Sequence, residues 1–192
     1  MSDTQDWRAR RWGETHQRIY DTAMQLFQEQ GFDQVSVGQI ASGAGVSVPT
    51  FYAHYQSKEH LVMQLPTAEE MQALLGTQPP ELPVAVRIRQ AMPVWFATWD
   101  PEYREVQLTR WKIIATTPSL RTRAAEFERT TAGMVAEAMP AEGGATLSPA
   151  DQVVVNAYLS AFTQGMLAWA DGGGERKLEE LVDEAFDALQ QH

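Results

Sequence analysis

The chain has 192 residues, a net charge of −10 and no cysteine. With 44% hydrophobic and 21% charged residues it has the composition of a folded protein, and its length suits a small and a medium domain or a single all-helical unit. The composition excludes a disulfide scaffold, thiolate metal sites, a membrane span and a signal peptide, so we expect a cytoplasmic protein.

The first predicted helix runs from about Glu14 to Gln30, because its apolar residues recur with a helical period. Gly31 follows as a helix-ending glycine, and Phe32 can pack back onto Phe27. Residues 1–13 are rich in arginine and are expected to be a mobile arm or a disordered tail, as chain termini usually are.

The stretch from Val35 to Leu61 predicts two short helices, a tight turn and the start of a third helix. Ser36 and Gln39 have the spacing of a capping box, in which the serine oxygen and the glutamine side chain satisfy amides at the helix start. Glycines at 43 and 45 end that helix, because glycine reaches left-handed backbone angles at little cost. Ser47 and Ser57 are predicted to cap the next two helices, with Pro49 in the first turn of the second.

This layout is typical of a DNA-binding helix-turn-helix, whose second helix enters the major groove. The stretch resembles the DNA-binding domain of the TetR family of bacterial transcriptional regulators. The residues that carry the resemblance are Ile40-Ala41, Ala44-Gly45-Val46-Ser47, Thr50, Tyr52, His54, Ser57-Lys58-Glu59 and Leu61. Two positions depart from the commonest pattern: Pro49 replaces a usual glycine, and Gly38 replaces a side chain that can reach a base.

The predicted DNA-binding residues come from both helices of the motif and the start of the third: Ser36, Gln39, Ser47, Val48, Pro49, Thr50, Tyr52, His54 and Lys58. Thr50, Tyr52, His54 and Lys58 are expected on phosphates, and Val48, Pro49 and Gln39 near base edges. Residues 1–60 hold five basic and seven acidic residues, a net charge of −2, and the remainder carries −8. This low basicity predicts a shallow salt dependence of DNA binding, although arginines of the arm could add a minor-groove contact.

The predicted domain boundary lies at Pro66, where proline interrupts the third helix of the motif. We expect an all-α chain with a three-helix helix-turn-helix domain at 1–65 and a helical ligand-binding and dimerisation domain at 66–192. Thr67 and Glu70 predict a fresh capping box after the break. The second domain is predicted to contain helices near 84–99, 101–115, 118–139, 149–171 and 175–191, with turns at Gly143-Gly144 and at 172–174.

Aromatic residues of the second domain form a candidate effector pocket, because the TetR resemblance implies a small-molecule ligand there. Its predicted lining is Trp95, Trp99, Trp111, Phe127, Tyr158, Phe162 and Met166. For any one of these residues, the simpler interpretation is ordinary packing in a hydrophobic core. The resemblance also implies a homodimer through the last two helices, with Ala161, Gly165, Leu178, Leu181, Val182 and Phe186 at the interface; packing within one chain would give the same spacing.

The function predicted from these features is a TetR-like transcriptional regulator, a repressor that a small-molecule effector releases from a pseudo-palindromic DNA operator. The alternative is a ligand-binding or protein-interaction module whose helix-turn-helix is vestigial. The sequence contains no phosphate-binding loop, nucleophile motif or histidine pair with metal-ligand spacing, so we expect neither an enzyme nor a bound cofactor or metal.

Overall fold

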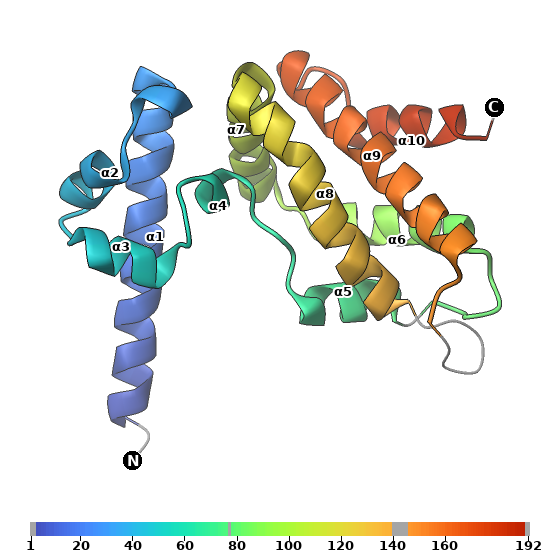
Figure 1. Cartoon of the computed structure of the whole chain (residues 1–192), viewed down its shortest axis with the longest axis horizontal. Coiled ribbons are helices and arrows are strands. Elements are labelled where there is room, and N and C mark those ends of the chain that lie inside the picture. Colours follow the sequence, from blue (N-terminus) through green and yellow to red (C-terminus); the bar gives the residue numbers. More distant parts are fainter. Residues whose placement is uncertain (1–2, 77, 140–145, 191–192) are drawn as a thin grey trace. The chain divides into compact units, whose positions relative to one another are not determined.

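The computed structural model describes residues 3–76, 78–139 and 146–190, with the side chains of 3–6 left out of the description. All regular structure in these ranges is helical, which confirms the predicted all-α class (Figure 1). The chain divides into two compact units, residues 1–64 and 65–192.

The first unit is built around one long helix. Its elements are α1 (Asp3–Gln30), the 3-10 turn η1 (Phe32–Gln34), α2 (Val37–Gly43), α3 (Val48–His54) and α4 (Glu59–Val62). Helix α3 crosses α1 near its middle, and the N-terminal part of α1 continues beyond α3 (Figure 1). The expected mobile arm is therefore wrong for residues 3–13. A helix already nucleated by packing extends at the gain of one hydrogen bond per residue, and no proline interrupts this segment.

Aromatic residues and one arginine hold α1 to the rest of the first unit. Gly31 adopts a φ of 83°, and the Phe27 and Phe32 rings lie 4.9 Å apart, as the helix-ending pattern predicted. The Arg18 guanidinium donates a hydrogen bond of 2.9 Å to the carbonyl of Ala44, in the turn between α2 and α3. That turn is consequently anchored to α1 by a polar contact as well as by the apolar core.

The segment after α3 departs from a continuous helix. Helix α4 has only four residues, and Lys58 precedes it without a side-chain cap. The predicted cap at Ser57 is thus wrong: the Ser57 hydroxyl lies 3.0 Å from Nδ1 of His60. The predicted break at Pro66 is confirmed, because Thr67 and Glu70 form a capping box that starts the separate helix α5 (Ala68–Leu75).

The second unit continues with α6 (Val84–Ala97), α7 (Pro101–Thr116), α8 (Pro118–Ala138), α9 (Pro149–Asp171) and α10 (Leu178–Ala188). These bounds agree closely with the predicted helices, except that α10 begins at 178 and ends at 188. Asp100 and Ser148 cap α7 and α9 ahead of a proline in the first turn, whereas Thr117 makes no side-chain cap before α8. The predicted turn at Gly143-Gly144 lies outside the described residues.

The core of the second unit lies where α9 meets α6, α8 and α10, with α8 and α9 adjacent along much of their length (Figure 1). The α9–α10 contact depends on a missing side chain. A Cβ atom built on Gly165 would lie 2.8 Å from Cγ2 and 3.0 Å from Cα of Val182. The two helix backbones can therefore approach this closely only with glycine at 165.

Candidate nucleic-acid interface

Helix α3 presents a compact outward face. Phe51 and Tyr55 are buried beneath it, whereas Val48 is 41% exposed and Tyr52 is 54% exposed. Pro49 is also exposed, and it occupies the first turn, where a backbone N–H would have no helical partner. The solvent-facing surface of α3 thus offers apolar atoms near its start and a phenol one turn later.

The start of α3 is fixed by the predicted cap. The Ser47 hydroxyl accepts a hydrogen bond of 3.2 Å from the Thr50 N–H and lies 2.7 Å from the Thr50 hydroxyl. Helix α2 starts in the same way, since Ser36 Oγ accepts from the Gln39 N–H while Gln39 Oε1 accepts from the Ser36 N–H. Gln39 Nε2 also donates to Gln30 at 3.5 Å. Ser36, Gln39 and Ser47 therefore stabilise the motif, and their polar atoms already have partners in the protein.

His54, the last residue of α3, belongs to an aromatic cluster that the sequence did not predict. The Trp12 ring stacks on His54 with centroids 3.8 Å apart, and the His16 ring lies 5.7 Å from His54 and 4.2 Å from Tyr55. Burial lowers the pKa of His54, and the nearby His16 lowers it further; burial also lowers the pKa of His16. Both rings are therefore favoured in the neutral form. The signal in the sequence was the four-residue spacing of Trp12 and His16, which places them on one face of α1.

Lys58 is used within the first unit. Its ammonium donates hydrogen bonds to the carbonyls of Phe32 at 2.8 Å and Val35 at 3.0 Å, and it lies 4.2 Å from the centre of the Phe32 ring. Lys58 thereby satisfies the carbonyls that follow α1 and supports the start of α2. This arrangement leaves at most one of its three N–H groups for a phosphate, the role predicted from the sequence.

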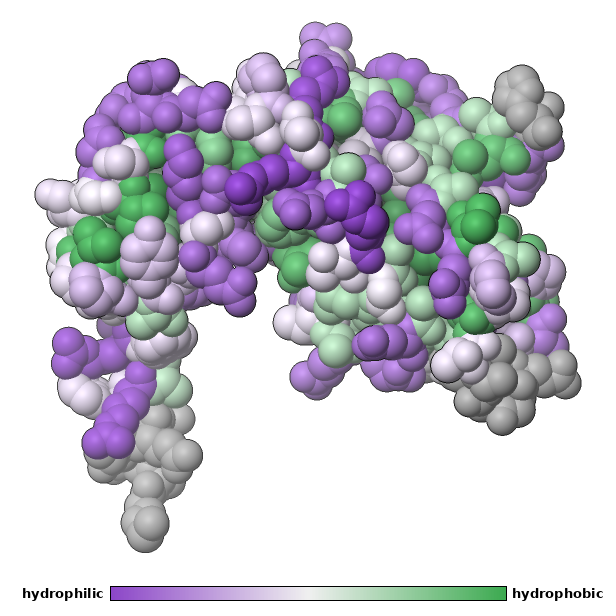
Figure 2. Space-filling model, in the orientation of Figure 1, coloured by the Kyte–Doolittle hydropathy of each residue, from purple (hydrophilic) through white to green (hydrophobic). Residues whose placement is uncertain are grey.

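An open hollow lies beside Tyr52, where the end of α3 meets the segment before α2. Its lining residues are Asp33, Gln34, Val35, Ser36, Val37, Tyr52, Ser57, Lys58 and Glu59. The part of α1 that extends beyond α3 has a mainly hydrophilic surface, whereas apolar side chains are exposed over α2 and α3 (Figure 2). The side of the unit that carries α3 is therefore shallow and mixes the apolar side chains of α3 with polar ones, as a surface that meets a major groove would.

The candidate effector residues gather partly around one ring cluster in the second unit. The Trp95 ring lies 5.2 Å from that of Trp99 and 5.6 Å from that of Phe162. Three further predicted residues, Trp111, Tyr158 and Met166, belong to the same hydrophobic core, and Phe127 lies half-buried on α8. The Trp99 indole N–H is buried with no hydrogen-bond partner among the described residues. A buried donor without an acceptor is costly, so the Trp99 N–H is a point at which a bound ligand could supply an acceptor.

The predicted dimer interface needs a correction. Leu178, Val182 and Phe186 are each 1% exposed within a single chain, and Ala161 and Gly165 are also buried. Inside one protomer Gly165 of α9 lies against Val182 of α10, and the Phe186 ring lies 4.8 Å from that of Tyr158. The five buried residues cannot also be the surface that a second subunit covers. Only Leu181 among the predicted residues remains partly exposed.

Comparison with known proteins places these features in a family. Residues 19–65 match the family described as bacterial regulatory proteins, tetR family, and residues 82–192 match the MftR C-terminal domain. AcrR of Shigella flexneri, an HTH-type transcriptional regulator, is 40% identical over 52 residues, which are 27% of this chain and 24% of AcrR. MftR of Mycobacterium tuberculosis is 30% identical over 118 residues, 58% of this chain and 57% of MftR. The match thus covers about a quarter of the length of AcrR and somewhat over half of the length of MftR.

The fold of the whole chain has a counterpart among solved structures. The TetR-family repressor FadR of Thermus thermophilus, solved in complex with lauroyl-CoA, superposes with a TM-score of 0.53 at 21% identity, over 91% of this chain and 93% of FadR. Among the described residues, no helix is long and apolar enough to cross a membrane. Since one domain family matches the helix-turn-helix and another matches more than half of the chain, this protein belongs to the TetR family of bacterial transcriptional regulators.

Proposed function

We propose that this protein is a ligand-responsive transcriptional repressor that binds a pseudo-palindromic operator as a homodimer. The observation that carries the proposal is the outward face of α3, where Val48, Pro49 and Tyr52 are exposed on a helix whose start is fixed by Ser47. A preformed recognition helix needs little ordering when it enters a major groove, so little binding free energy is lost on contact.

The residues of the motif take different roles in this proposal. Val48 and Pro49 meet base edges and thymine methyl groups, whereas Thr50 and Tyr52 contact phosphates and set the register of α3. His54 and Lys58 mainly hold the end of α3 and the start of α2, because Trp12 covers His54 and two carbonyls engage Lys58. Gln39 likewise acts through the capping box.

A homodimer supplies two recognition helices about one turn of DNA, roughly 34 Å, apart. Leu181 lies on a side of α10 where Ala185 is half-buried and Leu189 is exposed. We assign the contact with the second subunit to this side, because the neighbouring side of α10, with Leu178, Val182 and Phe186, is covered by its own chain. Leu181→Lys should give monomers in sedimentation velocity with unchanged helicity, and a dimer as stable as wild type would contradict the assignment.

Effector binding is assigned to the ring cluster around Trp95, Trp99 and Phe162. The ligand implied by this cluster is largely apolar and carries a hydrogen-bond acceptor for the buried Trp99 N–H. Release from DNA requires that the ligand bind more tightly to a dimer whose two α3 helices no longer match the half-site spacing. The proposal gives the chain no catalytic step and places it in the cytoplasm, where the chromosome is.

The test is selection of bound sequences from a random duplex pool in the presence of excess non-specific DNA. Enrichment of an inverted repeat supports a dimeric, sequence-specific regulator, and the repeat spacing reports the distance between the two α3 helices. The enriched duplex then serves to screen effectors by release. A folded protein that enriches no sequence, with or without candidate ligands, would instead favour a ligand-binding or protein-interaction module.

A further inference from the structure

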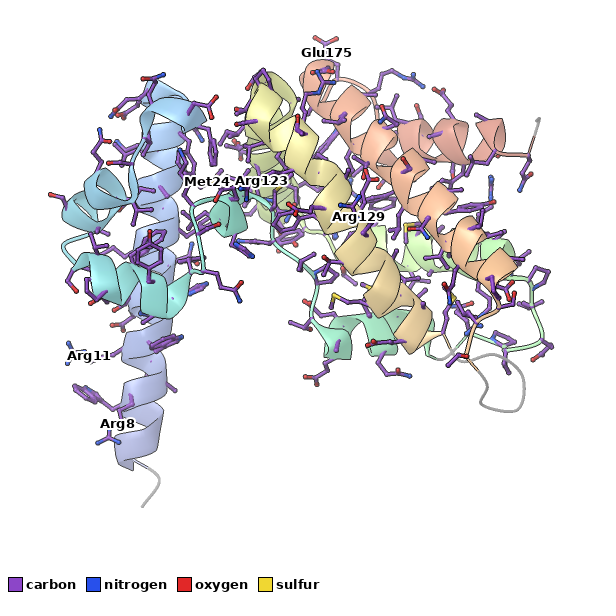
Figure 3. All side chains as sticks on the ribbon, in the orientation of Figure 1. Arg8, Arg11, Met24, Arg123, Arg129 and Glu175 are labelled. Atoms are coloured by element: carbon purple, nitrogen blue, oxygen red, sulfur yellow. The ribbon has the colours of Figure 1, made fainter. Side chains whose placement is uncertain are left out.

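The N-terminal part of α1 is a helical extension that contributes no residue to the buried core. Residues 7–14 are all exposed, and a Cβ atom on Gly13 would meet nothing within 4 Å. Arg8 and Arg11 project from the part of α1 that lies beyond α3 (Figure 3). Its helical form follows from continuity with the packed part of α1, so what the extension contributes is its exposed side chains.

Arginine is concentrated in the first half of α1. Between residues 7 and 18 the chain has four arginines and one glutamate, preceded on the same helix by Asp3 and Asp6. Arg18 is engaged with the carbonyl of Ala44, which leaves Arg8, Arg10 and Arg11 as the exposed basic group of the extension. The Arg11 guanidinium lies 4.8 Å from the centre of the Trp7 ring. These three residues are the majority of the five basic residues in the first 60.

The extension is fixed next to the end of α3. Trp12 stacks on His54, the last residue of α3, with an interplanar angle of 25°. At a rise of 1.5 Å per residue, Arg8 lies only about 6 Å from Trp12 along the α1 axis. A duplex whose major groove holds α3 therefore has backbone phosphates within reach of long arginine side chains on the extension.

An anionic membrane surface is the other polyanion to consider. Membrane-surface helices need a continuous apolar face, and residues 7–14, WRARRWGE, have none. Trp12, one of the two aromatic residues, is already stacked on His54. The charge of the extension and its attachment to α3 therefore favour nucleic acid.

We propose that residues 7–12 of α1 form a second DNA-contacting element, in which Arg8, Arg10 and Arg11 neutralise phosphates that flank the groove occupied by α3. This inference rests on the proposed function and extends it. It also changes the expected salt dependence, since the helix-turn-helix itself has few free basic groups. Three phosphate contacts per protomer correspond to a slope of log Kobs against log salt that is steeper by about 2.7, or by about five for a dimer.

The test compares three forms of the full-length protein on the selected duplex, by fluorescence anisotropy across a salt series. The first is wild type. The second is the triple variant Arg8→Gln, Arg10→Gln and Arg11→Gln. The third removes the same charge from exposed positions of α8 in the second unit: Arg121→Gln, Arg123→Gln and Arg129→Gln. Figure 3 labels Arg123 and Arg129. Circular dichroism checks that each variant keeps its helicity.

We expect the slope of log Kobs against log salt to be shallower by about five in the extension variant and unchanged in the α8 variant. Lysine at positions 8, 10 and 11 should restore the wild-type slope. Wild type should also bind a duplex with flanks of six base pairs more tightly than one cut at the repeat, and the extension variant should lose this preference. Equal slopes for the two glutamine variants would overturn the proposal. So would loss of binding to phosphatidylglycerol vesicles without a change in DNA binding. If wild type binds no duplex specifically, the proposed function fails, a result distinct from an unchanged slope.

Discussion

The close contact of α9 and α10 predicts that one substitution has opposite effects at two glycines. Gly165→Ala would place a methyl group 2.8 Å from Cγ2 and 3.0 Å from Cα of Val182. The first atom can move with its side chain, but the second belongs to the backbone of α10. Overpacking of this kind costs about 1–3 kcal/mol, whereas replacing glycine by alanine inside a helix gains about 1 kcal/mol.

Gly133 on α8 is the matched control. It is an exposed, mid-helix glycine, and a Cβ atom there would meet nothing within 4 Å. Gly133→Ala should therefore stabilise the protein by about 1 kcal/mol through helix propensity. Since both variants gain the propensity term, the difference between their free energies of unfolding isolates the contact with Val182 and should be about 1–3 kcal/mol.

The assay is urea unfolding followed by circular dichroism at two protein concentrations tenfold apart. We expect Gly165→Ala to unfold at lower urea than Gly133→Ala at both concentrations, because the contact lies within one protomer. A Gly165→Ala protein as stable as the Gly133→Ala protein would refute the packing argument. A stability loss that disappears at high protein concentration would place Gly165 between subunits, as the sequence analysis had it.

Three further predictions concern the first unit. Lys58→Met removes two charge-assisted hydrogen bonds to the carbonyls of Phe32 and Val35 and should lower stability by about 2 kcal/mol in thermal or urea unfolding; lost operator affinity at unchanged stability would instead restore a phosphate role. His16 and His54 have pKa values below the ordinary 6.5, so the folded state binds fewer protons than the unfolded state just below that pH. Their contribution to stability should be complete above pH 6.5 and decline as the pH falls below it, and urea midpoints between pH 7.5 and 5.5 should decline less in a His16→Gln, His54→Gln variant; equal declines would contradict this. Tyr52→Ala should weaken binding to all duplexes about equally, and wild-type affinity in this variant would refute the phosphate contact. Tyr52→Phe keeps the ring and removes only the hydroxyl, so its affinity measures what the hydroxyl contributes.

Local chemistry made much of the fold predictable. Ser36 and Ser47 cap helices where the sequence predicted caps, and Asp100 and Ser148 cap the helices predicted to begin near 101 and 149, because a cap involves only residues within one turn. The break at Pro66 followed from the proline and the adjacent capping box in the same way. Such signals need no knowledge of the rest of the chain.

Features that depend on distant partners were not predictable from the sequence. Lys58 engages carbonyls 23 and 26 residues earlier, and no local pattern indicates that choice. The stripe Leu178, Val182 and Phe186 has the spacing that either a subunit interface or an internal contact would require, and only the position of α9 decides between them. The extension of α1 was missed because its exposed residues have no apolar period.

The four-residue α4 and the irregular chain that follows it, up to Thr67, limit how the two units can communicate mechanically. A continuous helix transmits torque, because its backbone hydrogen bonds resist twisting about the axis. The segment from Met63 to Thr67 belongs to no helix, so rotation about its single bonds dissipates a twist within a few residues. A short covalent link of this kind can still transmit a pull, since five residues span at most about 18 Å when fully extended. In this protein, the covalent connection between the units therefore acts as a tether of limited length and does not transmit rotation.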